Sequence, residues 1–393
     1  MKAKRNRIFS CNDLLDKEKR SLAILELIRK KGAISRTDLS RTTGVNVVSI
    51  SNYVSSFIEK GLVVEKGLAA SSGGRKPGLV ELNVANNFCV GVDLCADEIT
   101  VILVDIGMKR LAKKTSPRPG NRGEVAAAVI AAIDAVLKES SASEASEASA
   151  ASAAKVRAVG IGLCSEKLFS VRDEVEKKYG VETFAAGEAV CGAYAEKELA
   201  SREGLNSILY MHSDLGRAVF IDGDRCLGYP GEISGAAPAA ADGSSCGDAT
   251  KYLNPWPECL GIVGTAKREV ERGVGTKIVS LAGGKVEKIT ARVVIDAARE
   301  KDETALGIIQ GIGTNLGIRI AYLINIFGPE AVVIGGGMEE ASDIAMPFIV
   351  KMAGRLSVKK YANSVKMAPS VLGREGLCLG ACALAVREVF VKA

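Results

Sequence analysis

Five residues between positions 46 and 52 have side chains suited to reading the edges of nucleic-acid bases. Asparagine and serine can hydrogen-bond to base edges, and valine can contact the methyl group of thymine. The five residues are Asn46, Val47, Ser49, Ser51 and Asn52. Two cations, Arg75 and Lys76, follow in a stretch rich in glycine and serine, where they could reach a minor groove or flanking phosphates. These residue types predict contact with both DNA bases and DNA phosphates.

Two helices and a hairpin are predicted to position these side chains. Apolar residues recur at helical spacing along the second helix and predict a buried face, made by Ile50, Val54, Phe57 and Ile58. Ser35 is expected to cap the first helix, and Gly61 to end the second in a left-handed conformation. Helix, turn, helix and basic hairpin, in this order, are typical of a winged helix-turn-helix. A small interaction domain with the same elements is the alternative.

The positive charge of the chain lies near its start. Residues 1–86 hold 16 Lys and Arg against 8 Asp and Glu, a net charge of +8. The rest of the chain holds 36 against 38, a net charge of −2. A basic segment suits the neutralisation of DNA phosphates, so the charge distribution supports the same prediction as the side chains.

The cysteines and the hydropathy pattern indicate the cellular compartment in which the protein acts. Ten cysteines are spread along the chain without a Cys-x-x-Cys pair, which predicts reduced thiols. No run of about eighteen apolar residues occurs, and the basic start of the chain lacks the apolar core of a signal peptide. We therefore expect a cytoplasmic protein that does not bind membranes.

Beyond residue 86, predicted strands and helices alternate, which favours a two-lobed α/β body. Residues 88–114 are expected to form a β-hairpin, and residues 371–390 a closing helix. The tract 139–154, rich in Ala, Ser and Glu, is expected to be a solvated linker. The predicted domains are a DNA-binding head at 1–86, an N-terminal lobe at 87–200 and a C-terminal lobe at 201–374, with a helix at 375–393 that returns to the N-terminal lobe.

Five motifs then identify a family by their order along the chain: GGRKP, GVDLCADEITVILVD, GEIS, PEAVVIGGG and LGREGLCLGACALA. Together with the winged helix-turn-helix, they resemble the ROK family (repressors, open reading frames and sugar kinases). The branch with a DNA-binding head contains the xylose- and N-acetylglucosamine-type repressors. The resemblance implies an α/β fold, in which a winged helix-turn-helix precedes a two-lobed, actin-like ATPase (ribonuclease H-like) body. It also implies a homo-dimer or a higher homo-oligomer.

The positions that hold ATP in the family's kinases are altered here. The first phosphate turn of the kinases reads DxGGT, whereas this chain has Asp93 and Asp97 around Leu94-Cys95-Ala96. The second phosphate turn corresponds to residues 213–217, which include Asp214 and Gly216. Carboxylates in both turns oppose the binding of a triphosphate unless a metal intervenes. We therefore expect degenerate phosphate loops and no ATP cofactor.

The catalytic and zinc positions of the family are altered as well. Glu188 stands where the kinases have a catalytic Asp, and the added methylene misplaces a general base. The family's GEIGH motif lacks its His in this chain. Of the family's three zinc cysteines, at most two have counterparts here, Cys246 and Cys259. Two thiolates cannot complete a tetrahedral site, so we expect no catalytic residue and no metal. Glu188 and the retained Glu232 are the candidate contacts for an effector between the lobes.

The resulting prediction is a transcriptional regulator, specifically a repressor, with a carbohydrate effector and a pseudo-palindromic operator in double-stranded DNA. Two alternatives stay open. The first is a sugar kinase that transfers a phosphoryl group from ATP to a hexose and carries an appended DNA-binding head. The second is a regulator without an effector, whose body only dimerises.

Overall fold

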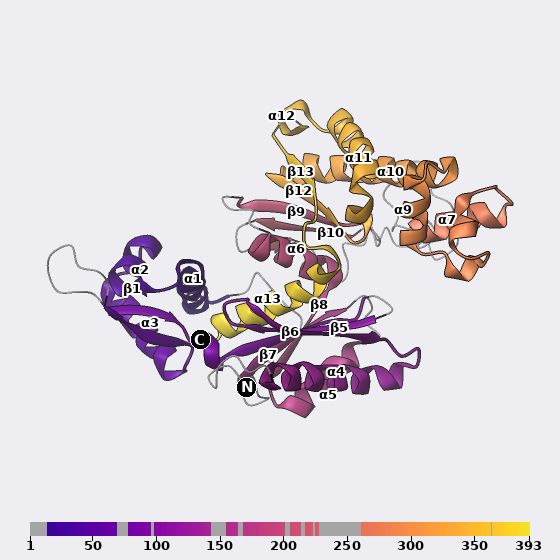
Figure 1. Ribbon diagram of the computed structural model, residues 1–393. Helices are drawn as coiled ribbons and strands as arrows, with labels where there is room; N and C mark the ends of the chain where they lie inside the picture. The colour runs from indigo at the N-terminus through magenta and orange to yellow at the C-terminus, as the bar shows by residue number, and fades with distance from the viewer. Residues whose placement is uncertain are drawn as a thin grey trace, which may run out of the picture. The chain divides into compact units, whose positions relative to one another are not determined.

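The computed structural model describes residues 14–68, 78–95, 98–142, 155–163, 168–200, 205–213, 217–222, 225–227, 261–362 and 364–393. The chain divides into two compact units. Unit 1 comprises Met1–Cys191 together with Leu377–Ala393, and unit 2 comprises Gly192–Gly376. Each unit is built around its own five-stranded sheet. The labels used below are those of Figure 1.

The first part of unit 1 is a winged helix-turn-helix, as predicted. Its elements are α1 (Asp16–Lys31), β1 (Ile34–Ser35), α2 (Arg36–Thr43), α3 (Val47–Glu59), β2 (Val63–Leu68) and β3 (Gly78–Leu82). The Ser35 hydroxyl accepts a hydrogen bond from the Asp38 amide at 3.1 Å, which confirms the predicted cap of α2. Gly61 follows α3 with a φ of +70°, a conformation that favours glycine.

One strand of this head has no signal in the sequence. The two residues of β1 pair antiparallel with Leu79 and Val80, so the wing sheet has three strands in the order β1-β3-β2. The predicted basic tip at 71–77 lies outside the described residues.

The body of unit 1 has the strand order β6-β5-β4-β7-β8. β4 pairs antiparallel with β5 and parallel with β7. The hairpin predicted at 88–114 is present as β4 and β5, but the prediction missed a third antiparallel strand, β6, which follows β5 and continues to residue 117. The strands are β4 (Phe88–Asp93), β5 (Glu98–Asp105), β6 (Arg110–Pro117), β7 (Val156–Leu163) and β8 (Glu182–Gly187).

Helices cover both faces of this sheet (Figure 1). In β5, Val101 and Leu103 belong to the core beneath α4 and α5, whereas Ile102 and Val104 belong to the core that includes α13. This alternation is the period of two expected for a strand buried on both sides. The short helix η1 (Val84–Asn86) leads into β4, and the longer helices are α4 (Arg122–Ala142), α5 (Phe169–Tyr179) and α13 (Gly376–Val391).

Unit 2 repeats the same strand order, β11-β10-β9-β12-β13. Its strands are β9 (Ser207–His212), β10 (Arg217–Asp222), β11 (Arg225–Leu227), β12 (Ala331–Gly335) and β13 (Lys366–Pro369). Its helices are α7 (Ile262–Glu271), α8 (Lys277–Leu281), α9 (Ala291–Arg299), α10 (Glu303–Phe327), α11 (Ser342–Leu356) and α12 (Lys359–Ala362), with η6 (Val286–Lys288), η7 (Met338–Ala341) and η8 (Gly373–Glu375). α6 (Glu188–Leu199) continues from unit 1 into unit 2. Two lobes with one strand order confirm the predicted actin-like ATPase body.

Across the described ranges, we find no helix that combines the length and the apolar character needed to cross a bilayer. The linker predicted at 139–154 is described only up to residue 142, where its first residues extend α4.

α13 lies unusually close to the sheet of unit 1, because glycines line the contact. A Cβ atom on Gly160 would lie 2.0 Å from the carbonyl oxygen of Ala381, and one on Gly91 would lie 2.4 Å from that of Cys378. Real Cβ atoms do not approach backbone this closely, so the helix rests on bare strand backbone.

Gly160→Ala should therefore destabilise unit 1, by about 1–3 kcal/mol or more, because α13 must move off the sheet. Urea unfolding followed by circular dichroism measures the loss. Gly120→Ala is the matched control, since a Cβ there meets no atom within 4 Å. Equal stability of the two variants would show that the contact between α13 and the sheet is loose.

Candidate nucleic-acid interface

The beginning of α3 presents the residues predicted to read bases. Asn46 precedes the helix, and its side-chain oxygen accepts a hydrogen bond from the Ser49 amide at 2.8 Å. This oxygen is therefore occupied as a helix cap, so Asn46 would approach DNA with its NH2 group. Val47 and Asn52 are exposed, whereas Ser49 and Ser51 are half-buried.

Val48 is the residue of this face that the sequence prediction missed. Its side chain is 73% exposed, compared with 44% for Val47. Helical spacing could have indicated it, because Val48 lies four residues before Asn52 and away from the buried Ile50 and Val54. An exposed valine at the start of α3 offers an apolar contact to a thymine methyl group.

Basic side chains around the head lie in ion pairs with carboxylates. Arg36 contacts Glu65 at 2.9 Å, and Lys66 contacts Glu81 at 2.7 Å. Exposed pairs of this kind contribute little to stability, so a DNA phosphate could replace the carboxylate at small cost. Arg75 and Lys76, the cations predicted to anchor the head, lie outside the described residues.

The end of α3 is held by a buried asparagine. The Asn87 side chain is fully buried, and its NH2 group donates to the carbonyl oxygens of Gly61 at 2.8 Å and Asn83 at 2.7 Å. Its side-chain oxygen accepts a hydrogen bond from Nε of Arg157, which lies on β7, at 2.5 Å. Every hydrogen-bonding group of this amide is therefore used between the head and the body of unit 1.

Arg157 also contacts the helix end directly. Its guanidinium donates to the carbonyl oxygen of Lys60 at 3.2 Å. Carbonyl groups at a helix C-terminus attract positive charge, and a strand of the body supplies that charge here. The Lys60 ammonium in turn donates to the carbonyl oxygen of Lys392, just after α13, at 3.4 Å.

Apolar packing also connects the head to the body of unit 1, at the boundary that we call the joint. One cluster of buried side chains includes Leu25, Phe57 and Val80 of the head together with Ile106 and Phe390 of the body. The orientation of α3 is therefore fixed against the body of unit 1 by both hydrogen bonds and a shared core.

Two positions of the kinase motifs, Asp93 and Glu188, are described in unit 1. Asp93 ends β4, where its carboxylate accepts a hydrogen bond from the Cys95 amide at 2.8 Å. Burial raises the pKa of Asp93, although that hydrogen bond and the charge of Arg118 act in the opposite direction. Glu188 begins α6 and is fully buried.

Cys191 lies close to both carboxylates. Burial raises the pKa of its thiol well above the ordinary value, and the charges of Asp93 and Glu188 raise it further. This region therefore contains a buried thiol whose pKa is raised by burial and by the carboxylates of Asp93 and Glu188. Asp97, Asp214, Gly216 and Glu232, the other positions predicted for phosphates or for an effector, lie outside the described residues.

The glycine turn after β12 is tied to the end of β9 within unit 2. The Ser213 hydroxyl donates to the carbonyl oxygen of Gly335 at 2.6 Å and accepts a hydrogen bond from the Met338 amide at 3.1 Å. Gly336 has a φ of +77°, and a Cβ there would lie 2.5 Å from Nδ1 of the buried His212. These contacts give the turn a packing role between the strand and the following helix.

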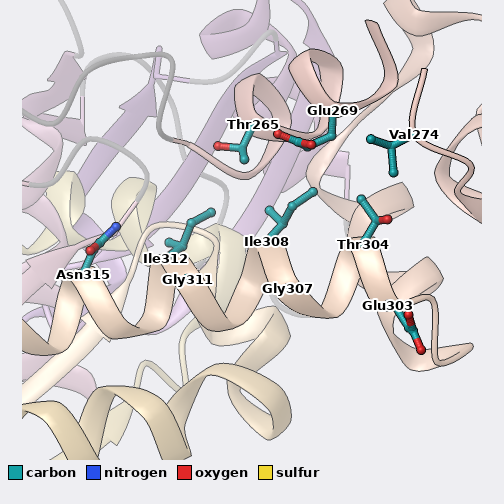
Figure 2. A pocket seen from close by; sticks show the side chains of 10 residues that line it. All are labelled: Thr265, Glu269, Val274, Glu303, Thr304, Gly307, Ile308, Gly311, Ile312 and Asn315. Carbon is teal, nitrogen blue, oxygen red and sulfur yellow. The ribbon is translucent and has the colours of Figure 1, made fainter. Parts of the chain in front are cut away.

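Unit 2 contains a cavity of about 420 Å³, which the sequence did not predict. It lies between α7 and α10, and Figure 2 shows side chains of both helices facing it. Its size is within the usual range for small-molecule sites. No Lys or Arg is among the described residues that line it, so it suits an uncharged ligand better than a phosphate. The lining residues are Thr265, Glu269, Val274, Glu303, Thr304, Gly307, Ile308, Gly311, Ile312 and Asn315.

Within the described ranges, no group of three or more His, Cys, Asp or Glu side chains is placed to hold a metal ion. Five cysteines with free thiols are Cys89, Cys95, Cys191, Cys378 and Cys382. Cys246 and Cys259 lie outside the described residues.

Asn87→Ala should destabilise unit 1 by about 1–3 kcal/mol, because it removes a fully buried partner of the Gly61 carbonyl and the Arg157 guanidinium. Denaturant unfolding of the full chain measures the change. Asn86→Ala is the matched control, since the Asn86 side chain is exposed and its loss should change stability by less than about 0.5 kcal/mol. A destabilisation no larger than that of the control would show that the Asn87 amide does not stabilise the contact between the head and the body of unit 1.

Both parts of the chain match families of known proteins. Residues 17–64 match the winged helix-turn-helix DNA-binding family, and residues 89–388 match the ROK family. A putative xylose repressor of Caldicellulosiruptor sp. (strain Rt8B.4) is 26% identical, over 96% of this chain and 98% of the relative. The DNA-binding transcriptional dual regulator NagC of Escherichia coli (strain K12) is 24% identical, over 95% of this chain and 94% of the relative.

Solved structures share the fold. A ROK family transcriptional regulator, a homolog of the E. coli MLC protein, has a TM-score of 0.72 at 22% identity, over 95% of this chain and 96% of that one. A ROK family glucokinase from Streptomyces griseus, in complex with glucose and AMPPNP, has a TM-score of 0.60 at 20% identity, over 76% of this chain and 99% of that one. With the family match covering most of its length, this chain belongs to the ROK family.

Proposed function

We propose that this protein is a DNA-binding transcriptional regulator that represses its target genes. The observation that carries the proposal is the exposed start of α3, which is anchored at its other end to a ROK body. The relatives named as xylose repressors and as NagC support it, since they match the chain over nearly its whole length. We expect the protein to act in the cytoplasm, as a homo-dimer on a pseudo-palindromic operator.

The residue types indicate which part of the head contacts bases and which part contacts phosphates. α3 contains no Lys or Arg, so Asn52 would read a base by paired hydrogen bonds, with Val47 and Val48 against thymine methyl groups. Arg75 and Lys76 would supply contacts to phosphates or to a minor groove. Base readout and anchoring are thereby separated between the helix and the hairpin.

We further propose that a carbohydrate effector controls the regulator through its body. Relatives named as xylose and N-acetylglucosamine repressors favour a sugar, and so does the fold shared with a glucokinase. Glu232 remains the proposed contact for a sugar hydroxyl. Glu188 is fully buried, so it would support the site rather than bind the sugar. The effector would act by favouring one of two arrangements of the protein.

The DNA-binding proposal can be tested with two variants that should behave differently. Arg75→Ala combined with Lys76→Ala should weaken binding to every sequence. It should also flatten the slope of log affinity against log salt concentration, by about 0.9 for each phosphate that is no longer neutralised. Asn52→Ala should instead reduce the preference for the selected operator over a scrambled one, by about 1–3 kcal/mol. Fluorescence anisotropy at several salt concentrations, on an operator selected by the wild-type protein from random DNA, measures both effects.

Lys113→Ala combined with Lys114→Ala is the matched control, because it removes two adjacent exposed cations from β6 of the body. It should leave affinity and salt dependence unchanged. No binding of the wild-type protein to any selected DNA would refute the proposal, and equal effects of all the variants would refute the separation of roles.

We also propose that the body does not transfer phosphoryl groups. The first phosphate turn has Cys95, Ala96 and Asp97 in place of its two glycines and its threonine, which opposes a triphosphate. Glu188, at the position of the catalytic base, is fully buried, which opposes a general base in contact with substrate. ATP with magnesium and a panel of hexoses and pentoses should therefore give no sugar-dependent release of ADP in a coupled assay. Sugar-dependent turnover that Glu188→Gln abolishes would establish the kinase alternative instead.

A further inference from the structure

The recognition helix α3 has a second attachment to the body of unit 1, besides the hydrogen bonds of Asn87. Lys60, which caps the end of α3, accepts a hydrogen bond from Arg157 through its backbone carbonyl. Its ammonium donates in another direction, to the carbonyl oxygen of Lys392 just after α13, at 3.4 Å. Figure 1 shows this end of α13 next to α3. The end of α3 is therefore held from β7 and also from the segment that follows α13.

The edge strand β8 holds the Lys392 side chain. The Lys392 ammonium pairs with the Glu182 carboxylate and lies 4.7 Å from the centroid of the Phe184 ring. Glu182 and Phe184 are two positions apart on β8, so their side chains lie on one face of the sheet. A cation is attracted by both the carboxylate and the face of the ring. Lys392 thus connects three elements: α3 through its carbonyl oxygen, β8 through its ammonium, and α13 through the chain.

Both β8 and α13 also contact the start of α6. β8 ends at Gly187, and Glu188 begins α6 directly after it. α13 rests on the first turn of α6, since a Cβ on Gly380 would lie 1.8 Å from the carbonyl oxygen of Cys191. Backbones in such close contact cannot shift independently. A displacement at the start of α6 would therefore be passed to both elements that hold Lys392.

The same place is where the chain passes between the two units. The chain leaves unit 1 after Cys191 and returns to it at Leu377, three residues before Gly380. A change in unit 2 can reach unit 1 along the chain at these two crossings. Both crossings adjoin the contact between α6 and α13, so both lie on elements that lead toward Lys392.

We propose that Lys392 is a positioning residue that couples the start of α6 to the recognition helix α3. Asn87 and Arg157 fix one side of the helix end, and the contact with Lys392 fixes its rotation about that point. The ion pair of Lys392 is exposed and individually weak, so it can adjust without unfolding the head. The proposal rests on the proposed function, because it assigns the residue through which the body sets the position of the reading face.

Lys392→Met tests the positioning role, because it removes the charge and keeps a long side chain. The preference for the selected operator over a scrambled one should fall by at least about fivefold, the lower end of typical coupling between sites. The urea midpoint should stay unchanged, since the residue is exposed. The slope of log affinity against log salt concentration should also stay unchanged, since the charge is already paired with Glu182. Fluorescence anisotropy and urea unfolding measure these quantities.

Three further variants sharpen this test. Glu182→Gln removes the other half of the ion pair and should have the same effect as Lys392→Met. Lys392→Arg should retain the wild-type preference, because a guanidinium also pairs with a carboxylate and stacks on a ring. Lys277→Met is the matched control, since Lys277 is an exposed lysine of unit 2 that pairs with Glu300 at 3.2 Å.

An operator preference of Lys392→Met equal to that of Lys277→Met would overturn the proposal. A lower urea midpoint with unchanged preference would also overturn it, because Lys392 would then be a structural residue. A flatter salt dependence would overturn it as well, by identifying Lys392 as a phosphate contact.

A double-mutant cycle tests the coupling to α6. Glu188→Gln alone should change the operator preference by roughly fivefold or more. In the Lys392→Met background, the same substitution should change it by less than about twofold, because the connection to α3 is lost. Equal effects of Glu188→Gln in both backgrounds, or no effect in either, would overturn the coupling.

Hydrogen exchange separates these outcomes from failure of the proposed function, because it needs no DNA. Amides in the last turn of α3 should exchange at least about fivefold faster in Lys392→Met than in Lys277→Met. Unchanged exchange would overturn the proposal whether or not the protein binds DNA. A wild-type protein that binds no selected DNA, together with faster exchange in Lys392→Met, would retain the attachment of α3 and refute the regulator.

Discussion

The organisation of unit 1 depends on one buried amide at the boundary between head and body. The Gly61 carbonyl, just past the end of the recognition helix α3, accepts hydrogen bonds from both Asn83 and Asn87. Asn87 then accepts one from Arg157 and stands directly before the first strand of the body. A fully buried amide is costly when any of its groups is unpaired, so the joint tolerates one arrangement of helix and sheet.

This constraint has a mechanical consequence for DNA binding. The residues proposed to read bases lie at the start of α3, and the anchored groups lie at its end. The helix has 13 residues and is therefore about 20 Å long. A tilt of roughly 10° at the anchored end would shift the reading end by about 3 Å, which is the length of a hydrogen bond. The body can thus set the position of the reading face without touching DNA.

The body has the fold of its family, and we propose that it lacks the phosphoryl-transfer chemistry of the family's kinases. The two five-stranded sheets need only buried strands and close helix contacts, and both are present. Phosphoryl transfer needs a few groups at exact positions, which by resemblance to the kinases correspond here to Cys95, Ala96, Asp97 and Glu188. Sheet packing tolerates such substitutions, whereas a triphosphate site does not. The glycine turn after β12 illustrates the point, because packing against His212 and Ser213 is sufficient reason for its glycines.

The sequence by itself determined the elements whose signals are local. Helical spacing predicted α3, a serine predicted the cap of α2, a glycine predicted the end of α3, and alternating elements predicted two lobes. Only the tertiary structure showed how the head is attached to the body. In the sequence, nothing distinguishes Asn87 from other polar residues of a connecting segment, and Arg157 lies seventy positions away. It also decided the two-residue strand β1, which exists only by pairing with β3, and the exposure of Val48. Periodicity and capping act over a few neighbouring residues, whereas a buried hydrogen bond or an uncovered helix face depends on which distant segments the topology brings together.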